Sequence, residues 1–143
     1  MKWLTQTSVF VSLFFLSTLS ALPQDLAKLE GKWSVKKANN EGQAYTQSLE
    51  IKKDKFKFSM VGSNGQVFLY AEGDVKLTKL GPFSAIKFFN IKAGASADQT
   101  ESIDDDHEAI YVLDDKTWTL ASNFDKSRDN QKPSADAYTR VSK

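Results

Sequence analysis

The sequence contains no cysteine and a single histidine among its 143 residues. Without cysteine, the chain has no disulfide framework, no thiol nucleophile and no attachment site for the lipid of a lipoprotein. A zinc site needs more nitrogen or sulfur ligands than His107 alone supplies. Phosphate-binding glycine loops, dinucleotide-binding glycine patterns and Gly-x-Ser-x-Gly elbows are also missing. We therefore expect no cofactor, no metal site and no enzymatic activity.

Long apolar runs occur only at the start of the chain. Lys2 precedes an apolar stretch at residues 9–16, and small residues follow at Ser20 and Ala21. The stretch fits the roughly 7–15 residues of a signal-peptide core and is shorter than the about 20 residues of a membrane-spanning helix. We predict a signal peptide at residues 1–20, cleaved after Ser20 or after Ala21, and no stable membrane span after cleavage. The alternative is an uncleaved N-terminal anchor.

The predicted mature part, residues 21–143, has the length of a single domain. Lys2 is the only charge in the signal peptide, so its removal takes one of the 19 basic residues, leaves all 18 acidic ones and gives zero net charge. Nucleic-acid binders are usually basic on one face, whereas basic and acidic residues are interspersed here, so we expect no nucleic-acid partner. Export without disulfides, and without an Asn-x-Ser/Thr glycosylation acceptor, favours a bacterial envelope protein that is periplasmic or extracellular.

Apolar residues of the mature part follow the period of two that is typical of strands. Trp33 and Val35 alternate with polar neighbours, and residues 49–60 have the pattern of a hairpin. The pair Asn64-Gly65 favours the positive φ angles of a hairpin turn. Eight or nine short strands, separated by turn signals every 8–12 residues, are expected for an all-β sandwich or barrel.

Three segments depart from this simple alternation. Leu26 and Leu29 lie three residues apart, which predicts one short helical turn over residues 24–30. Residues 67–71 are apolar on both faces, so we expect the helical turn or a partner protein to cover part of the outside. Residues 92–107 show no period and are predicted to form the longest loop.

The predicted loop carries consecutive acidic residues, Asp104, Asp105 and Asp106, beside His107. Hard oxygen ligands in a flexible loop could hold Ca²⁺. However, a Ca²⁺ loop spaces its ligands and includes a glycine for the turn, and three consecutive side chains do not converge easily on one ion. We therefore interpret the run as a solvated acidic loop that discourages edge-to-edge strand pairing, and His107 as an exposed structural residue.

Two ends of the mature chain resemble lipocalins. Segment 29–35, with Gly31 and Trp33, resembles their Gly-x-Trp opening, and segment 138–141 resembles their final strand, where an arginine, here Arg140, lies across that tryptophan. The order of hairpins between them is similar to a family of small exported bacterial lipocalin-like proteins of uncharacterised function. The resemblance implies an antiparallel up-and-down barrel of about eight strands with a short N-terminal helical turn. It implies no particular activity.

Closure of such a barrel makes a testable contact, because the first and last strands become neighbours. We predict that the guanidinium of Arg140 stacks on the indole of Trp33 and donates to free carbonyls of the turn at 24–30. Gly31, Trp33 and Arg140 are therefore the predicted residues of barrel closure. The alternative is that Arg140 is an ordinary solvated strand residue.

The apolar residues of the strands either fill the barrel or line a pocket in it. The interior of an eight-stranded barrel is just wide enough to be filled by side chains or to hold one small ligand, and close packing is the default. The predicted lining residues are Phe58, Met60, Leu69, Phe88, Tyr111 and Trp118.

These observations leave three functions open. The first is an exported lipocalin-like barrel that binds a small apolar ligand, and the second is a protein-interaction or structural domain of the cell envelope with a filled core. A hydrolase with paired carboxylates is the third, because Asp and Glu are plentiful, but such an enzyme is defined by the separation of its carboxylates and not by their abundance.

Overall fold

The computed structural model describes residues 24–142, so the predicted signal peptide at residues 1–20 lies outside the described residues. Within the described part, no helix has the length and apolar character needed to cross a bilayer. The elements are α1 (Gln24–Leu29), β1 (Gly31–Ala38), β2 (Ala44–Lys52), β3 (Lys55–Gly62), β4 (Val67–Leu80), β5 (Phe83–Ser96), β6 (Gln99–Ser102), β7 (His107–Leu113), β8 (Thr117–Ser122) and β9 (Ser134–Arg140).

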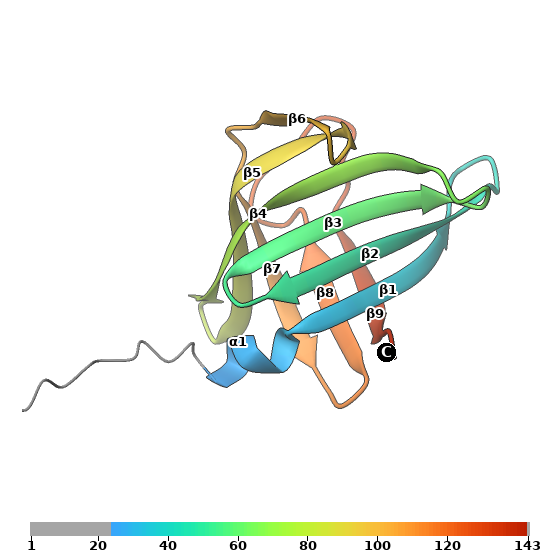
Figure 1. The fold of residues 1–143 in the computed structure, drawn as a ribbon. Helices are drawn as coiled ribbons and strands as arrows, with labels where there is room; N and C mark the ends of the chain where they lie inside the picture. Colours follow the sequence, from blue (N-terminus) through green and yellow to red (C-terminus); the bar gives the residue numbers. More distant parts are fainter. Residues whose placement is uncertain (1–23, 143) are drawn as a thin grey trace, which may run out of the picture.

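Eight of these strands form a closed antiparallel barrel (Figure 1). Strands β1 to β5 pair in chain order, β5 continues to β7, β8 and β9, and β9 returns to pair with β1. The remaining strand, β6, pairs with the far end of β5, which β7 does not reach. The predicted all-β, antiparallel up-and-down barrel of about eight strands with a short N-terminal helical turn is confirmed.

The prediction of one long loop over residues 92–107 is wrong. β5 runs on into this segment and turns back as β6, and only residues 103–106 separate β6 from β7. Gly94 permits the hairpin, because a Cβ at this position would overlap the carbonyl group of Gln99. The segment is rich in small and polar residues, so its strands carry little of the apolar alternation that reveals a strand in sequence.

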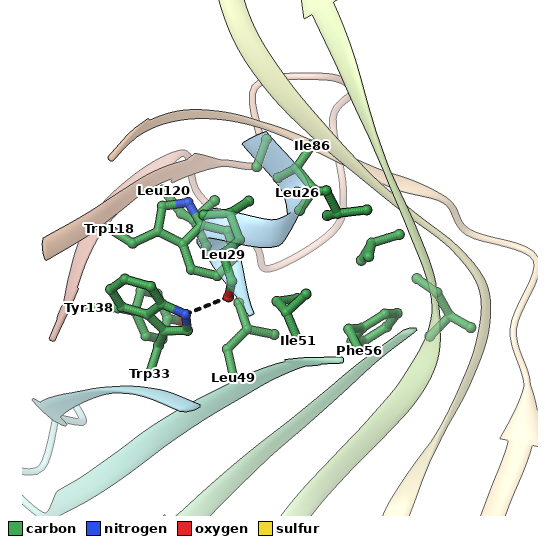
Figure 2. Packing of buried hydrophobic residues seen from close by; sticks show 13 residues of the cluster. Leu26, Leu29, Trp33, Leu49, Ile51, Phe56, Ile86, Trp118, Leu120 and Tyr138 are labelled. Carbon is green, nitrogen blue, oxygen red and sulfur yellow. Dashed lines mark hydrogen bonds between the residues drawn. The ribbon is translucent and has the colours of Figure 1, made fainter. Parts of the chain in front are cut away.

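Helix α1 closes one end of the barrel from the inside. Leu26 and Leu29 belong to the buried core, and the indole N–H of Trp33 donates to the carbonyl of Leu29 at 2.9 Å (Figure 2). The expectation that this turn covers the outside of residues 67–71 is therefore wrong for the helix. Its leucines are removed from water more completely inside the barrel end than they would be on an outer strand surface.

The hydrophobic core occupies the end of the barrel next to α1 (Figure 2). The indoles of Trp33 and Trp118 meet edge to face with ring centroids 5.5 Å apart, a favoured aromatic geometry. Full burial of each large side chain stabilises the fold by about 1.5–3 kcal/mol. This end is thus sealed by packing. The largest side chains without exposed surface are Trp33, Trp118, Leu29, Ile51 and Ile86.

Opposite charges alternate across the outer face of β1 to β5. The register places Lys32 opposite Glu50, Glu50 opposite Lys57, Lys57 opposite Glu72, and Glu72 opposite Lys92. Opposite charges that face each other across antiparallel strands stabilise that pairing modestly. A one-residue slip would turn these charges toward the core, so the pattern helps to fix which side chains face the interior.

Candidate functional site

The three predicted closure residues meet at the sealed end of the barrel. Trp33 of β1 pairs with Arg140 of β9, and the guanidinium carbon lies 4.1 Å from the centroid of the indole. Arg140 Nη1 donates to the carbonyl of Glu30 at 2.6 Å, and Nη2 donates to that of Lys28 at 2.8 Å. Gly31 has a φ of 120°, and a Cβ there would lie 3.0 Å from Arg140 Nη1. The arginine therefore ties the last strand to the helix and the first strand.

The register shows where the predicted lining residues point. Directly opposed residues of an antiparallel pair face the same side of the sheet, so a buried partner marks an inward side chain. Leu69 pairs with Met60, and all six predicted lining residues share the inner surface. The pairs with buried partners are Phe58 with Leu49, Met60 with Gln47, Phe88 with Val75, Tyr111 with Leu120 and Trp118 with Tyr138.

The six residues differ in how far they are buried. Trp118 is fully buried in the core, and its Nε1 finds no acceptor in the part of the chain that the structure describes. Phe58, Phe88 and Tyr111 are half-buried and pack against the core. Met60 and Leu69 are also half-buried, and Met60 lines a cleft at the open end of the barrel. Trp118 is thus a packing residue, and Met60 is the one of the six that borders the cleft.

This cleft lies between the β1–β2 turn and the β3–β4 turn, which sit together at the end of the barrel opposite α1 (Figure 1). Its volume is about 680 Å³, within the 300–1,000 Å³ typical of small-molecule sites. The rings of Tyr45 and Phe68 meet edge to face, 6.0 Å apart, and Phe68 is 51% exposed at the lip. The lining residues are Asn39, Gln43, Ala44, Tyr45, Met60, Gly62, Ser63, Asn64, Gln66 and Phe68.

Next to the cleft, one inner wall of the barrel is polar. Lys37 Nζ lies 2.7 Å from a carboxylate oxygen of Asp136, and this ion pair joins β1 to β9 beyond the two register pairs that connect their backbones. The Tyr138 hydroxyl donates to Gln47 Oε1 at 3.1 Å. Burial raises the pKa of Tyr138, so this hydroxyl stays protonated at neutral pH. The wall thus combines a neutralised ion pair with a neutral hydrogen-bonding pair.

The acidic run has charged partners, and its interpretation as a solvated loop is wrong for Asp105, which is half-buried, whereas Asp104 and Asp106 are exposed. Asp105 accepts from Arg128 Nε at 2.8 Å and pairs with Lys126, and Asp106 lies 3.0 Å from Lys87 Nζ. Hydrogen bonds from Arg128 and Lys126 hold the pKa of Asp105 well below its usual range. Asp105 thus fastens the β8–β9 loop to the segment between β6 and β7, and Asp106 ties the same segment to β5.

Arg128 is the centre of this cluster, and its side chain is only 7% exposed. It donates to Asp125 at 2.7 Å, to Asp105, and to the carbonyl of Asp106 at 2.9 Å. Burial favours the protonated form of Asp125, but hydrogen bonds from Arg128 and from the backbone N–H of Glu108 outweigh it and lower the pKa to about 2. The cluster is therefore a partly buried structural clamp.

His107 lies beside this clamp and is half-buried, not exposed as predicted. Its Nε2 is 3.3 Å from Asp105 Oδ2. Burial lowers the pKa of His107, which favours the neutral imidazole. Within residues 24–142, no three His, Asp or Glu side chains are grouped so that they could hold a metal ion.

Sequence reasoning missed the polar wall and part of the cleft. Counting in steps of two from buried Leu49 places Gln47 and Tyr45 on the same inner face, so the strand period itself contained the signal. Comparisons with protein-family models, curated proteins and solved structures found no match. The resemblance to small lipocalin-like proteins therefore stays a prediction.

Proposed function

We propose that the protein is an exported, non-enzymatic binding module that holds a small, mainly apolar molecule at the open end of its barrel. The observation that carries this proposal is the 680 Å³ cleft between two hairpin turns. Met60 belongs to the inner row of the barrel and also lines the cleft, so the cleft borders the inner surface at this residue. The exposed ring of Phe68 offers an apolar contact to a ligand that arrives from solvent.

The packed end of the barrel supports this location. The indoles of Trp33 and Trp118 leave no exposed surface there, and α1 blocks access from outside. In the open half, by contrast, the inward side chains of Phe58, Met60 and Leu69 are only half-buried. A filled-core interaction domain would not need apolar side chains left partly exposed along its inner face.

Titration with the neutral fluorescent probe N-phenyl-1-naphthylamine tests the proposal. We expect saturable one-to-one binding, and we expect Met60→Trp to weaken it about tenfold, because the larger ring occupies the cleft. If the Met60→Trp variant folds poorly, Ser63→Trp at the edge of the cleft gives an independent test. Val112→Trp is the matched control, since Val112 is 68% exposed and is not among the cleft-lining residues.

The competing function predicts a different result. A filled-core domain would bind no probe. Alternatively, any weak fluorescence of the probe would change equally with Met60→Trp and with Val112→Trp. Either result would refute the binding proposal. Circular dichroism of each variant separates a blocked cleft from a misfolded barrel.

A further inference from the structure

The inner surface beside the cleft has two unlike walls. Gln47 and Tyr138 form a hydrogen-bonded pair on β2 and β9, next to the ion pair of Lys37 and Asp136. In the same inner row as Gln47, the register places Met60 on β3, followed by Leu69 on β4. A molecule that enters from the cleft therefore meets hydrogen-bonding groups on one side and apolar groups on the other.

The side-chain amide of Gln47 uses only one of its two polar atoms in a hydrogen bond within the described residues. Its side chain is 7% exposed, and its Oε1 accepts from Tyr138, but no hydrogen bond of its Nε2 is found within the described residues. The polar side-chain atoms that are both sealed from solvent and unpartnered in this part of the chain are Thr78 Oγ1 and Trp118 Nε1, so Gln47 Nε2 keeps some accessible surface. Buried amides are normally satisfied, and this one has a donor left for a ligand or water.

The ion pair decides which charge a ligand can carry. Lys37 and Asp136 lie 2.7 Å apart and neutralise each other, so neither offers an unpaired charge to a ligand. Moving an ionised group from water into a largely buried site is costly unless a counter-charge awaits it. A neutral hydrogen-bonding group avoids this cost and still satisfies Gln47.

We propose that the cleft selects neutral amphiphiles: an apolar or aromatic body lies against Tyr45, Met60 and Phe68, and an uncharged acceptor such as a carbonyl reaches the amide of Gln47. This inference rests on the proposed binding function. Gln47 is the specificity-determining residue, and anions are disfavoured because Asp136 already neutralises Lys37.

A pair of naphthalene probes tests the selectivity on the full chain. The neutral probe is 6-propionyl-2-(dimethylamino)naphthalene, which carries one carbonyl, and the anionic probe is 2-anilinonaphthalene-6-sulfonate. We expect the neutral probe to bind at least about tenfold more tightly. Gln47→Leu should weaken the carbonyl probe about fivefold to tenfold, yet change binding of N-phenyl-1-naphthylamine less than about twofold, because that molecule has no carbonyl acceptor.

Removing one charge of the ion pair should change the selectivity. Asp136→Asn leaves Lys37 unpaired, so the anionic probe should gain about tenfold in affinity. The double variant Lys37→Met/Asp136→Asn removes the charge again and should lose that gain, which separates charge from a general disturbance of the wall. The inference is overturned if the unaltered chain binds the two probes equally well, or if Asp136→Asn does not change the affinity for the anionic probe. In either case, binding of N-phenyl-1-naphthylamine would still support the cleft as a binding site. Failure of N-phenyl-1-naphthylamine to bind at all overturns the proposed function, and this inference with it.

Discussion

Arg140→Ala is expected to lower the free energy of unfolding by about 2–3 kcal/mol. The guanidinium lies 4.1 Å from the centroid of Trp33 and donates to the carbonyls of Glu30 and Lys28 at 2.6 Å and 2.8 Å. A cation–π contact at an exposed site contributes about 0.5–1 kcal/mol. Each hydrogen bond from this charged donor adds about 1 kcal/mol, the lower part of the usual range, because Arg140 is exposed and solvent screens it.

Further substitutions separate the contributions of the arginine, the tryptophan and the glycine to this contact. Arg140→Lys keeps the charge but loses the flat fork, so we expect a loss of about 1–2 kcal/mol. Trp33→Ala should cost about 3–5 kcal/mol, because the indole is fully buried. Gly31→Ala should cost about 1–3 kcal/mol, since a φ of 120° is strained for alanine and its Cβ would crowd the guanidinium.

Urea unfolding followed by circular dichroism measures these losses, and a double-mutant cycle isolates the contact. Trp33→Ala and Arg140→Ala should show a coupling energy of about 1 kcal/mol or more. Trp33→Phe can replace the alanine variant if that variant does not fold. Lys36→Ala, on the exposed outer face of β1, is the control and should change stability by less than about 0.5 kcal/mol. Additive losses would show that the two residues do not interact, and the closure reasoning would fail.

Three further predictions concern the acidic cluster and the chain start. Asp125 has a pKa lowered to about 2, so its stabilising effect is complete above the unfolded value near 4 and is lost as the pH falls toward 2. Asp125→Asn should therefore remove about 1 kcal/mol of pH-dependent stability in acid melts, because Asp125 is partly exposed and solvent screens its charge; an unchanged acid transition would contradict this. Calorimetry should detect no Ca²⁺ site tighter than about 10 μM, because Asp105 is already paired with two cations; a one-to-one site would prove the reverse. N-terminal sequencing of the exported protein should begin at Ala21 or Leu22, whereas a membrane-bound protein that still starts at Met1 would rule out cleavage.

The barrel itself could be predicted because its signals are local. Alternating apolar residues and the turn at Asn64-Gly65 give the strands, and Trp33 and Arg140 give the closure. The pairing of β5 with β6 could not be predicted, since it depends on a backbone approach at Gly94 that leaves no apolar pattern. The helix was predicted, but its inward position was not, because the space that Leu26 and Leu29 fill exists only once the sheet has closed into a barrel.

The candidate site was predicted only in part, for a similar reason. The period of two placed Met60 on the inner face, but the cleft beside it is lined by two turns that only the folded sheet brings together. Gln47 is polar at an inward position, so it does not stand out in a search for apolar alternation. Arg128 and Asp105 are 23 residues apart, and no sequence pattern predicts their contact.

Methyl NMR of the full chain labelled on methionine tests the central claim most directly. The chain has two methionines, Met1 and Met60, so the spectrum contains two signals, and Met60→Leu identifies the one from the cleft. On titration with N-phenyl-1-naphthylamine, the Met60 signal should shift and saturate at one equivalent while the Met1 signal does not follow the same curve. A Met60 signal that stays in place while the probe is taken up would mean that the molecule binds elsewhere, and an unmoved signal without uptake would mean that the barrel holds no such ligand.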